Sequence, residues 1–427
     1  MFKKYFNLKI KVIFVCAVAT LGGCASYLAQ NEKTKNFVRN GQITSALEEL
    51  KILSEKEGRD QLVHMLNYAS VLQINGDYKQ SAIMFNRADQ LTDSNDYHSV
   101  TNVVASTLGS EEMIQYKGES YEKFLINSMN AINYLMLGDY DAALVECRKI
   151  NNKISSFKTE GREPYEFSSF ARYLSAVIWE SQKNYDDAYI EYEGAYKLDP
   201  SIPTIKEDLI RISKLAQRYE SLAKWKKEFS YDKEALLAEK TDNSLGELIV
   251  IHQQGFGARK VARRDQPRFP TLLPENQQTQ KIKISFFKAS HLKQDFIVRD
   301  SIESKIIYDV DKISQQTLNK DYNSLIARRL GGMAAKAVVA SQIGQKNEAL
   351  GQIAWIAMNL SDRADLRQWS TLPAKIQMAR VFLKPGQYQI KIQGIDYSGS
   401  STADLLSSQV LVVRSGKKTF VNYRSLR

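Results

Sequence analysis

A short pattern that recurs along the first half of the chain limits its fold more than any other feature. A turn of the Gly-Asp-Tyr type separates two amphipathic segments, and an alanine follows a few residues later. Glycine permits the left-handed backbone of a tight turn, and alanine lets two helices approach closely. The pattern therefore predicts repeated helical hairpins. Its copies are Gly41-Gln42-Ile43 with Ala46, Gly76-Asp77-Tyr78 with Ala82, Gly138-Asp139-Tyr140 with Ala143, and Asn184-Tyr185 with Ala188.

The hairpin pattern resembles the tetratricopeptide repeat, whose units are about 34 residues long. The four turns are 35, 62 and 45 residues apart. The first two copies are therefore in register, and the later ones carry insertions near residues 93–118 and 153–164. Three or more such units stack into a stable solenoid. We expect a mainly α fold that begins with a tetratricopeptide-like helical domain over residues 24–235, capped by a long helical region over 205–229.

The hydrophobic pattern changes near residue 240, where alternating and β-branched runs replace the helical period. The sequence predicts an α+β C-terminal domain over residues 245–427, with an antiparallel sheet and helices on one face. Pro385-Gly386 predicts a hairpin turn between two of its strands. Strands are expected at 245–252, 282–286, 296–298, 306–308, 376–383, 388–395, 409–414 and 420–423, and helices at 325–343 and 347–360.

The N-terminus has the composition of an export signal. Four lysines lie in the first eleven residues, and the apolar run 12–21 is too short to span a hydrocarbon core of about 30 Å. Leu21-Gly22-Gly23-Cys24 follows and resembles a bacterial lipobox. The resemblance implies a lipoprotein signal peptide over residues 1–23, cleavage before Cys24, and acylation of that cysteine, with palmitate as the expected fatty acid. Ala25 then implies sorting to the outer membrane.

Charge and cysteine content exclude several other classes of protein. The net charge is +11, and most of this excess is diffuse, which argues against a nucleic-acid partner. Cys147 lies among apolar neighbours on an amphipathic segment, so we expect a buried core residue and no disulfide. No spacing of cysteines or histidines predicts a metal or cofactor site.

Four apolar residues are expected on the concave side of the solenoid. Ile132, Leu135, Tyr173 and Val177 lie on the first helices of two hairpins. One interpretation makes them a groove for a periplasmic or envelope protein. The other fills the groove with the chain's own insertions or its C-terminal half.

Two further segments have unusual composition. Arg259, Lys260, Arg263 and Arg264 form a basic patch that would suit an anionic surface or would simply be a solvated loop. Residues 363–373 combine an Arg-Asp-Arg set with a tryptophan, which is typical of a buried connector and would also suit a binding cleft.

Several longer stretches carry a resemblance to a family. Residues 116–122, 131–146 (AINYLMLGDYDAALVE), 170–200, 246–255 and 363–380 (RADLRQWSTLPAKIQMAR) resemble, in that order, a poorly characterised family of Gram-negative lipoproteins containing tetratricopeptide repeats. The resemblance covers nearly the whole mature chain. It implies a fold and a location at the outer membrane facing the periplasm, and it supplies no catalytic residues.

Three functions are compatible with these features. The first is a non-enzymatic protein-interaction scaffold in cell-envelope assembly or maintenance. The second is an activator of a peptidoglycan synthase, and the third is an enzyme acting on cell wall or polysaccharide. Ser285 with Lys288 and Ser155 with Lys158 have the spacing of serine–lysine enzymes, but the companion motifs are missing. We therefore predict no enzyme and no catalytic residue, and leave the oligomeric state open.

Overall fold

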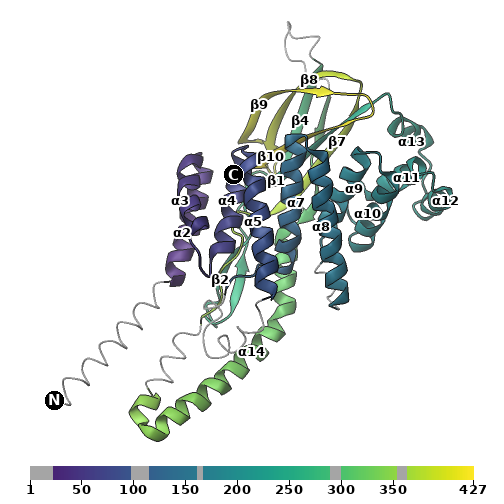
Figure 1. The fold of residues 1–427 in the computed structure, drawn as a ribbon. Coiled ribbons are helices and arrows are strands. Elements are labelled where there is room, and N and C mark those ends of the chain that lie inside the picture. The colour runs from purple at the N-terminus through teal and green to yellow at the C-terminus, as the bar shows by residue number, and fades with distance from the viewer. Residues whose placement is uncertain (1–22, 98–114, 161–166, 289–299, 353–362) are drawn as a thin grey trace.

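The computed structural model describes residues 23–97, 115–160, 167–288, 300–352 and 363–427. A row of helical hairpins lies on one side of the body, and two β-sheets lie on the other (Figure 1). Residues 1–22 of the expected signal peptide, the expected strand at 296–298 and most of the expected helix at 347–360 lie outside the described residues.

The helical half consists of tetratricopeptide-type hairpins in which two helices meet at a tight turn. Gly41, Gly76 and Gly138 have φ angles of 74°, 81° and 73°, so each turn uses the left-handed conformation that glycine favours. The next residue can cap the second helix, as Asp139 does by accepting a bond from the Ala142 amide at 3.0 Å. The helices are α2 (Gly23–Arg39), α3 (Ile43–Glu55), α4 (Gln61–Ile74), α5 (Tyr78–Tyr97), α7 (Ser120–Leu137), α8 (Tyr140–Thr159), α9 (Ser169–Ser181), α10 (Tyr185–Leu198), α11 (Ile205–Leu215), α12 (Tyr219–Glu228) and α13 (Glu234–Lys240).

The long helical region predicted over 205–229 is helical and consists of a further hairpin of two helices. α11 ends at Leu215 and α12 begins at Tyr219. Gln217 occupies the left-handed region at a φ of 55°, and Lys183 does the same at 62° between α9 and α10. Because neither residue is a glycine, the sequence signal is weaker for the fourth turn, at Lys183, and no copy of the pattern marks the fifth turn, at Gln217.

The C-terminal half contains two four-stranded sheets. Sheet A has the strand order β10-β1-β7-β6, and sheet C has the order β5-β4-β8-β9. All pairs are antiparallel except β1 with β10, which is parallel. The strands are β1 (Gly246–Gln254), β4 (Lys281–Lys288), β5 (Asp300–Glu303), β6 (Lys305–Asp309), β7 (Lys375–Leu383), β8 (Gly386–Ile395), β9 (Ser401–Val413) and β10 (Lys418–Ser425), and a separate hairpin joins β2 (Arg259–Ala262) to β3 (Pro270–Leu273).

The hairpin predicted at Pro385-Gly386 is absent, because β7 and β8 belong to different sheets. The chain leaves sheet A after Leu383 and enters sheet C at Gly386. The β2–β3 hairpin was not expected either. The helix predicted at 325–343 is part of a longer one, α14 (Val310–Lys346), which extends away from the body (Figure 1).

The two halves of the chain share one hydrophobic core. One face of sheet A packs on sheet C through residues such as Val250 and Ile390. Its other face packs on the helices through Ile249, Ile251 and Met378, in the same cluster as Leu66 of α4 and the hairpin residues around it. The order of layers is therefore helices, sheet A and sheet C. In the described parts of the chain, no helix combines the length and the apolar character needed to cross a bilayer.

Candidate functional site

The concave face of the solenoid, formed by α4, α7, α9 and α11, is covered by the rest of the chain. Gln73 of α4 shows the contact, because its side chain bonds Asn133 of α7 at 2.7 Å and Gln253 of β1 at 2.9 Å. Sheet A and the connector between residues 363 and 374 lie where a ligand of such a face would bind. We call this region the covered face.

The interpretation of four residues as a partner-binding groove is therefore corrected. Ile132, Leu135, Tyr173 and Val177 are only 0 to 4% exposed and belong to the shared core. They lie on the concave side of the helices, as the hairpin pattern suggests. The strands of the same chain cover them, so they are not available to another protein in this structure.

Trp369 of the connector is buried in the covered face. Its indole nitrogen donates to the Ser70 hydroxyl at 2.8 Å, and its backbone amide donates to the Glu122 carboxylate at 2.9 Å. Its ring lies 5.6 Å from the ring of Phe85. Two residues further on, the Thr371 amide and hydroxyl donate to the side chain of Asn67 at 3.1 and 2.9 Å. The connector therefore binds the helices much as a peptide ligand would.

The Arg-Asp-Arg set of the connector has a structural role. Arg367 donates to Asp365 at 2.9 and 2.7 Å and to Asp60 of the helical half at 3.1 Å. Its guanidinium also lies 5.5 Å from the ring of Tyr116. These contacts fix the direction of the chain at this point.

A second polar part of the covered face is a cluster of six buried charged residues. Three acids and three bases meet where α9 and α11 contact sheet A, and all six side chains are almost fully buried. We call this set the charge cluster. Its members are Glu180, Asp208, Arg211, Glu247, Arg380 and Lys418.

Each charge of the cluster is paired with at least two others. Arg211 bonds Glu180 and Asp208 at 2.9 Å each. Arg380 bonds Asp208 at 2.9 Å and Glu247 at 2.7 Å. Lys418 of β10 completes the set by pairing with Glu180 of α9 at 2.9 Å and with Glu247 of β1.

The pKa values of the two glutamates in the cluster are lowered despite their burial. Burial raises the pKa of Glu247, but the nearby Arg380 and Lys418 outweigh it and lower the pKa to about 2. In the same way, Arg211 and Lys418 hold the pKa of Glu180 well below its usual range against the effect of burial. Because three negative charges meet three positive ones, the network is closed and leaves no charge for a ligand.

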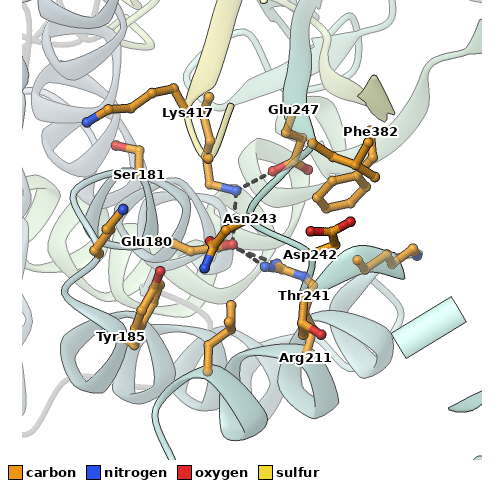
Figure 2. A pocket seen from close by; sticks show the side chains of 16 residues that line it. Glu180, Ser181, Tyr185, Arg211, Thr241, Asp242, Asn243, Glu247, Phe382 and Lys417 are labelled. Carbon is orange, nitrogen blue, oxygen red and sulfur yellow. Dashed lines mark hydrogen bonds and ion pairs between the residues drawn. The ribbon is translucent and has the colours of Figure 1, made fainter. Parts of the chain in front are cut away.

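A small pocket opens to solvent beside the charge cluster. It lies between α9, α11 and the start of β1, and Figure 2 shows Glu180, Arg211 and Glu247 at its wall, joined to cluster partners by dashed lines. Asp242 at its rim bonds the amide of Ser244 at 2.8 Å. The carboxylates of the pocket are engaged in ion pairs and turn bonds, so none is placed as a general base or a nucleophile.

Sequence reasoning missed Glu122, whose carboxyl group is buried at the start of α7. Burial and the neighbouring Glu119 raise its pKa to about 7. It accepts bonds from the Tyr116 hydroxyl at 2.5 Å, the Glu119 amide at 3.0 Å and the Trp369 amide. The pair Glu119 and Glu122 has the spacing of a capping box, and that spacing is the signal that predicts a helix start here.

The four residues of the expected basic patch lie on β2 and in the turn that follows. Lys260 pairs with Glu119 at 2.9 Å, Arg259 with Glu32 at 3.5 Å, and Arg263 with Asp265 at 2.9 Å. Arg264 is exposed. Since acids of the same chain neutralise three of the four, the patch offers little net charge to an anionic surface.

Cys24 and Cys147 lie on two different helices, α2 and α8. Cys147 is buried in the shared core, and burial raises the pKa of its thiol to about 12, so its interpretation as a core residue is confirmed. Cys24 lies in the first turn of α2. Within the residues that the structure describes, no group of three or more His, Cys, Asp or Glu side chains is arranged to hold a metal ion.

Comparison with known proteins adds little to this geometry. No family model matches the chain, and no curated protein matches it. Solved structures with a similar fold include a tetratricopeptide repeat protein from Parabacteroides merdae (17% identity, 51% of this chain and 71% of that chain, TM-score 0.33). Others are MamA from Desulfovibrio magneticus RS-1 (16% identity, 52% and 98%, TM-score 0.32) and a putative kinesin light chain from Podosopora anserina (14% identity, 52% and 95%, TM-score 0.33). Because these TM-scores are low, we draw no conclusion from these similarities about the function of this chain.

Proposed function

We propose that this protein is a non-enzymatic scaffold, anchored by an acylated Cys24 to the periplasmic face of the outer membrane, that binds envelope proteins through its outer surface. The observation that carries this proposal is the covered face. A solenoid whose concave side is filled by its own connector and sheet presents mainly its convex side to partners.

The convex side carries an apolar stripe that suits such contacts. Ile83, Val145 and Ile190 each lie seven residues after the left-handed residue of their turn, and they are 40 to 50% exposed. They lie on α5, α8 and α10, which neighbour one another through pairs such as Lys153 with Asp89 at 2.6 Å. Equivalent positions in stacked repeats line up across the surface. We call these three residues the convex stripe.

The position of Cys24 supports a close anchor. Tyr27, three residues further on, is buried and donates its hydroxyl to the Gln368 carbonyl at 2.9 Å. Three residues span at most about 10 Å. A lipid on Cys24 would therefore hold the folded body directly at the membrane surface, and two or more acyl chains are needed for stable anchoring.

The anchor is tested by changing Cys24 to serine in the full-length chain. We expect uncleaved precursor, no incorporation of an alkyne-labelled palmitate, and loss of the protein from outer-membrane fractions. Cys147→Ser is the matched control and should keep both label and location. Unchanged labelling and fractionation of Cys24→Ser would contradict the lipoprotein part of the proposal.

The scaffold is tested on the convex stripe. The triple variant Ile83→Lys, Val145→Lys, Ile190→Lys should lose crosslinked envelope partners while keeping its thermal midpoint, because exposed positions tolerate charge. Ile52→Lys, an exposed change outside the stripe, should keep the same partners. An identical set of crosslinked proteins for the wild type and the triple variant would refute the assignment of partners to this face.

A further inference from the structure

We propose that the pocket beside the charge cluster binds a small ligand through an anionic group, a carboxylate or a phosphate. Turns from both halves of the chain form the pocket, and Figure 2 shows Tyr185, Asn243 and Lys417 among the side chains that line it. Concave sites with a few convergent polar groups are where small ligands usually bind. The pocket is separate from the convex stripe and from the lipid anchor.

The acids that line the pocket are all paired within the chain. Glu180 and Glu247 are held by bases of the charge cluster. The carboxylate of Asp242 accepts bonds from the amide and the hydroxyl of Ser244 at 2.8 and 2.6 Å. Five basic residues line the pocket beside these three acids, so the lining has an excess of positive charge.

Two lysines supply this excess charge. Lys183 lies in the turn between α9 and α10, Lys417 lies in the turn between β9 and β10, and both are exposed. Within the described part of the chain, neither ammonium group has an ion pair or a hydrogen bond, and the hydroxyl of Tyr185 has no hydrogen bond either. An anion in the pocket could therefore receive charge-assisted bonds without breaking an existing contact.

Lys418 adds a buried donor to the same pocket. Its side chain is 8% exposed, and its ammonium group pairs with Glu180 at 2.9 Å and with Glu247. An ammonium group has three N–H donors, so one remains after these two contacts. Because Lys418 lines the pocket, this third donor is available to an oxygen of the ligand. The charge cluster can thus contribute a bond while it stays intact.

The backbone of Lys183 indicates that its side chain has a function. Lys183 has a φ of 62°, and glycine holds the equivalent left-handed position in three earlier turns. A residue with a side chain is less stable than glycine in this conformation. Strained residues of this kind are concentrated at ligand sites. The lysine keeps a cation at the pocket despite its cost in stability.

Backbone bonds hold the two turns at the pocket together. The Gly416 amide donates to the Leu245 carbonyl at 2.8 Å, and the Ser415 hydroxyl donates to the Asn243 carbonyl at 2.7 Å. These bonds join the turn before β10 to the segment before β1. They fix the backbone of Lys417 before a ligand arrives, which reduces the entropy lost on binding.

The proposal is tested by isothermal titration calorimetry on the full-length chain in mild detergent at low ionic strength. The probes are succinate, inorganic phosphate and succinamide, which has the shape of succinate without its charges. We expect saturable binding of at least one of the two anions and no binding of succinamide. The anion that binds more tightly identifies the charged group of the ligand as a carboxylate or a phosphate.

Lys183→Gly is the most informative variant, because it relaxes the turn and removes the cation at once. It should raise the thermal midpoint and weaken anion binding about tenfold, as expected for the loss of one charge-assisted bond. Lys417→Met should weaken binding to a similar extent at an unchanged midpoint, and Lys417→Arg should preserve it. Lys227→Met, an exposed lysine of α12 outside the pocket, is the matched control and should bind like the wild type.

Three results would overturn the inference. The first is a wild type that binds neither anion. The second is equal binding of succinate and succinamide, because the charge would then not be recognised. The third is an unchanged anion affinity in both Lys183→Gly and Lys417→Met, which would place the bound anion elsewhere on this basic chain. The tests of Cys24 and of the convex stripe are unaffected by any of these results.

Discussion

Two adjacent lysines show how burial decides the effect of a charge. The side chain of Lys418 is only 8% exposed and pairs with Glu180 and Glu247 in the charge cluster, whereas Lys417 is exposed. Lys418→Met should lower the free energy of unfolding by about 3–5 kcal/mol, because it leaves two buried carboxylates short of a cation. Urea unfolding of the full-length protein measures this.

Lys417→Met is the control and should change stability by less than about 0.5 kcal/mol, as surface substitutions do. Equal losses in the two variants would mean that the cluster contributes through chain packing and not through charge pairing.

Glu122 predicts a pH dependence of stability. Its pKa is raised from 4.5 to about 7, chiefly by burial. The stabilisation from the protonated carboxyl group is therefore complete below about pH 4.5 and is lost as the pH rises towards 7. Glu122→Gln cannot ionise. The unfolding free energy of the variant minus that of the wild type should therefore rise by about 1–3 kcal/mol from pH 5 to pH 8.

Glu247 supplies a control of opposite sign. Its pKa is lowered to about 2, so the stabilisation that it provides is present above about pH 4.5 and is lost as the pH falls towards 2. The stability deficit of Glu247→Gln should therefore shrink in acid. A difference between Glu122→Gln and wild type that stays constant from pH 5 to pH 8 would disprove the assigned shift.

Sequence reasoning placed single residues correctly on helix faces and failed to identify what covers them. Tyr173 and Val177 lie one helical turn apart and share a face, as their spacing predicts. That face contacts sheet A, whose strands come much later in the sequence. Arg380 of β7 donates to the Tyr173 hydroxyl at 2.9 Å. The two residues are 207 positions apart, and no local sequence pattern predicts a contact over that distance.

At the scale of the hairpin, the same turn position is occupied by glycine in one repeat and by lysine in the next, so the two residues can be compared. Gly138 and Lys183 occupy the same left-handed position in successive hairpins, with φ angles of 73° and 62°. A side chain at Gly138 would meet nothing within 4 Å, so only backbone strain opposes it. Gly138→Ala should cost about 1 kcal/mol, and Lys183→Gly should gain up to about 1 kcal/mol.

Thermal or urea unfolding of the two single variants measures these changes, and their sum should be close to zero in the double variant. A stabilising Gly138→Ala would show that the turn tolerates other backbone angles.

Elements with strong local signals were predictable and those set by distant pairing were not. β4 follows from apolar alternation and β1 from a run rich in strand-forming residues, and four of the hairpin turns follow from their residues. The turn at Gln217 was missed because glutamine seldom adopts a positive φ. Pro385-Gly386 does mark the junction between two strands, but the choice of sheet depends on contacts between β8 and β4, which are about 100 residues apart.

At the scale of the whole molecule, the shared core predicts one cooperative unit. Apolar residues of α4, α9, β1 and β7 belong to the same hydrophobic core. On the side where the two halves meet, neither half therefore has a hydrophobic core of its own. Urea unfolding followed by far-UV circular dichroism and by tryptophan fluorescence should give coincident transitions. Lys418→Met should shift both transitions equally, and two separate transitions would show independent domains.

The division of the chain into a helical and a mixed half was visible in the change of hydrophobic period near residue 240. The way the halves combine was not. Trp369 and Arg367 have the composition of a buried connector, and the sequence supported that interpretation. Only the three-dimensional arrangement shows that the connector lies on the concave face of the helices.

The order of strands in sheet A has a consequence for the timing of folding. β10 pairs with β1, whose residues are made 171 positions earlier, as in the pair Glu247 and Lys418. Because chains are synthesised at roughly 5–20 residues per second, β10 is made on the order of 10 s after β1. Until then the run Leu248–Ile251 lacks one of its two partner strands. A messenger truncated before β10 would yield a chain with a permanently open apolar edge, a substrate for chaperones and proteases.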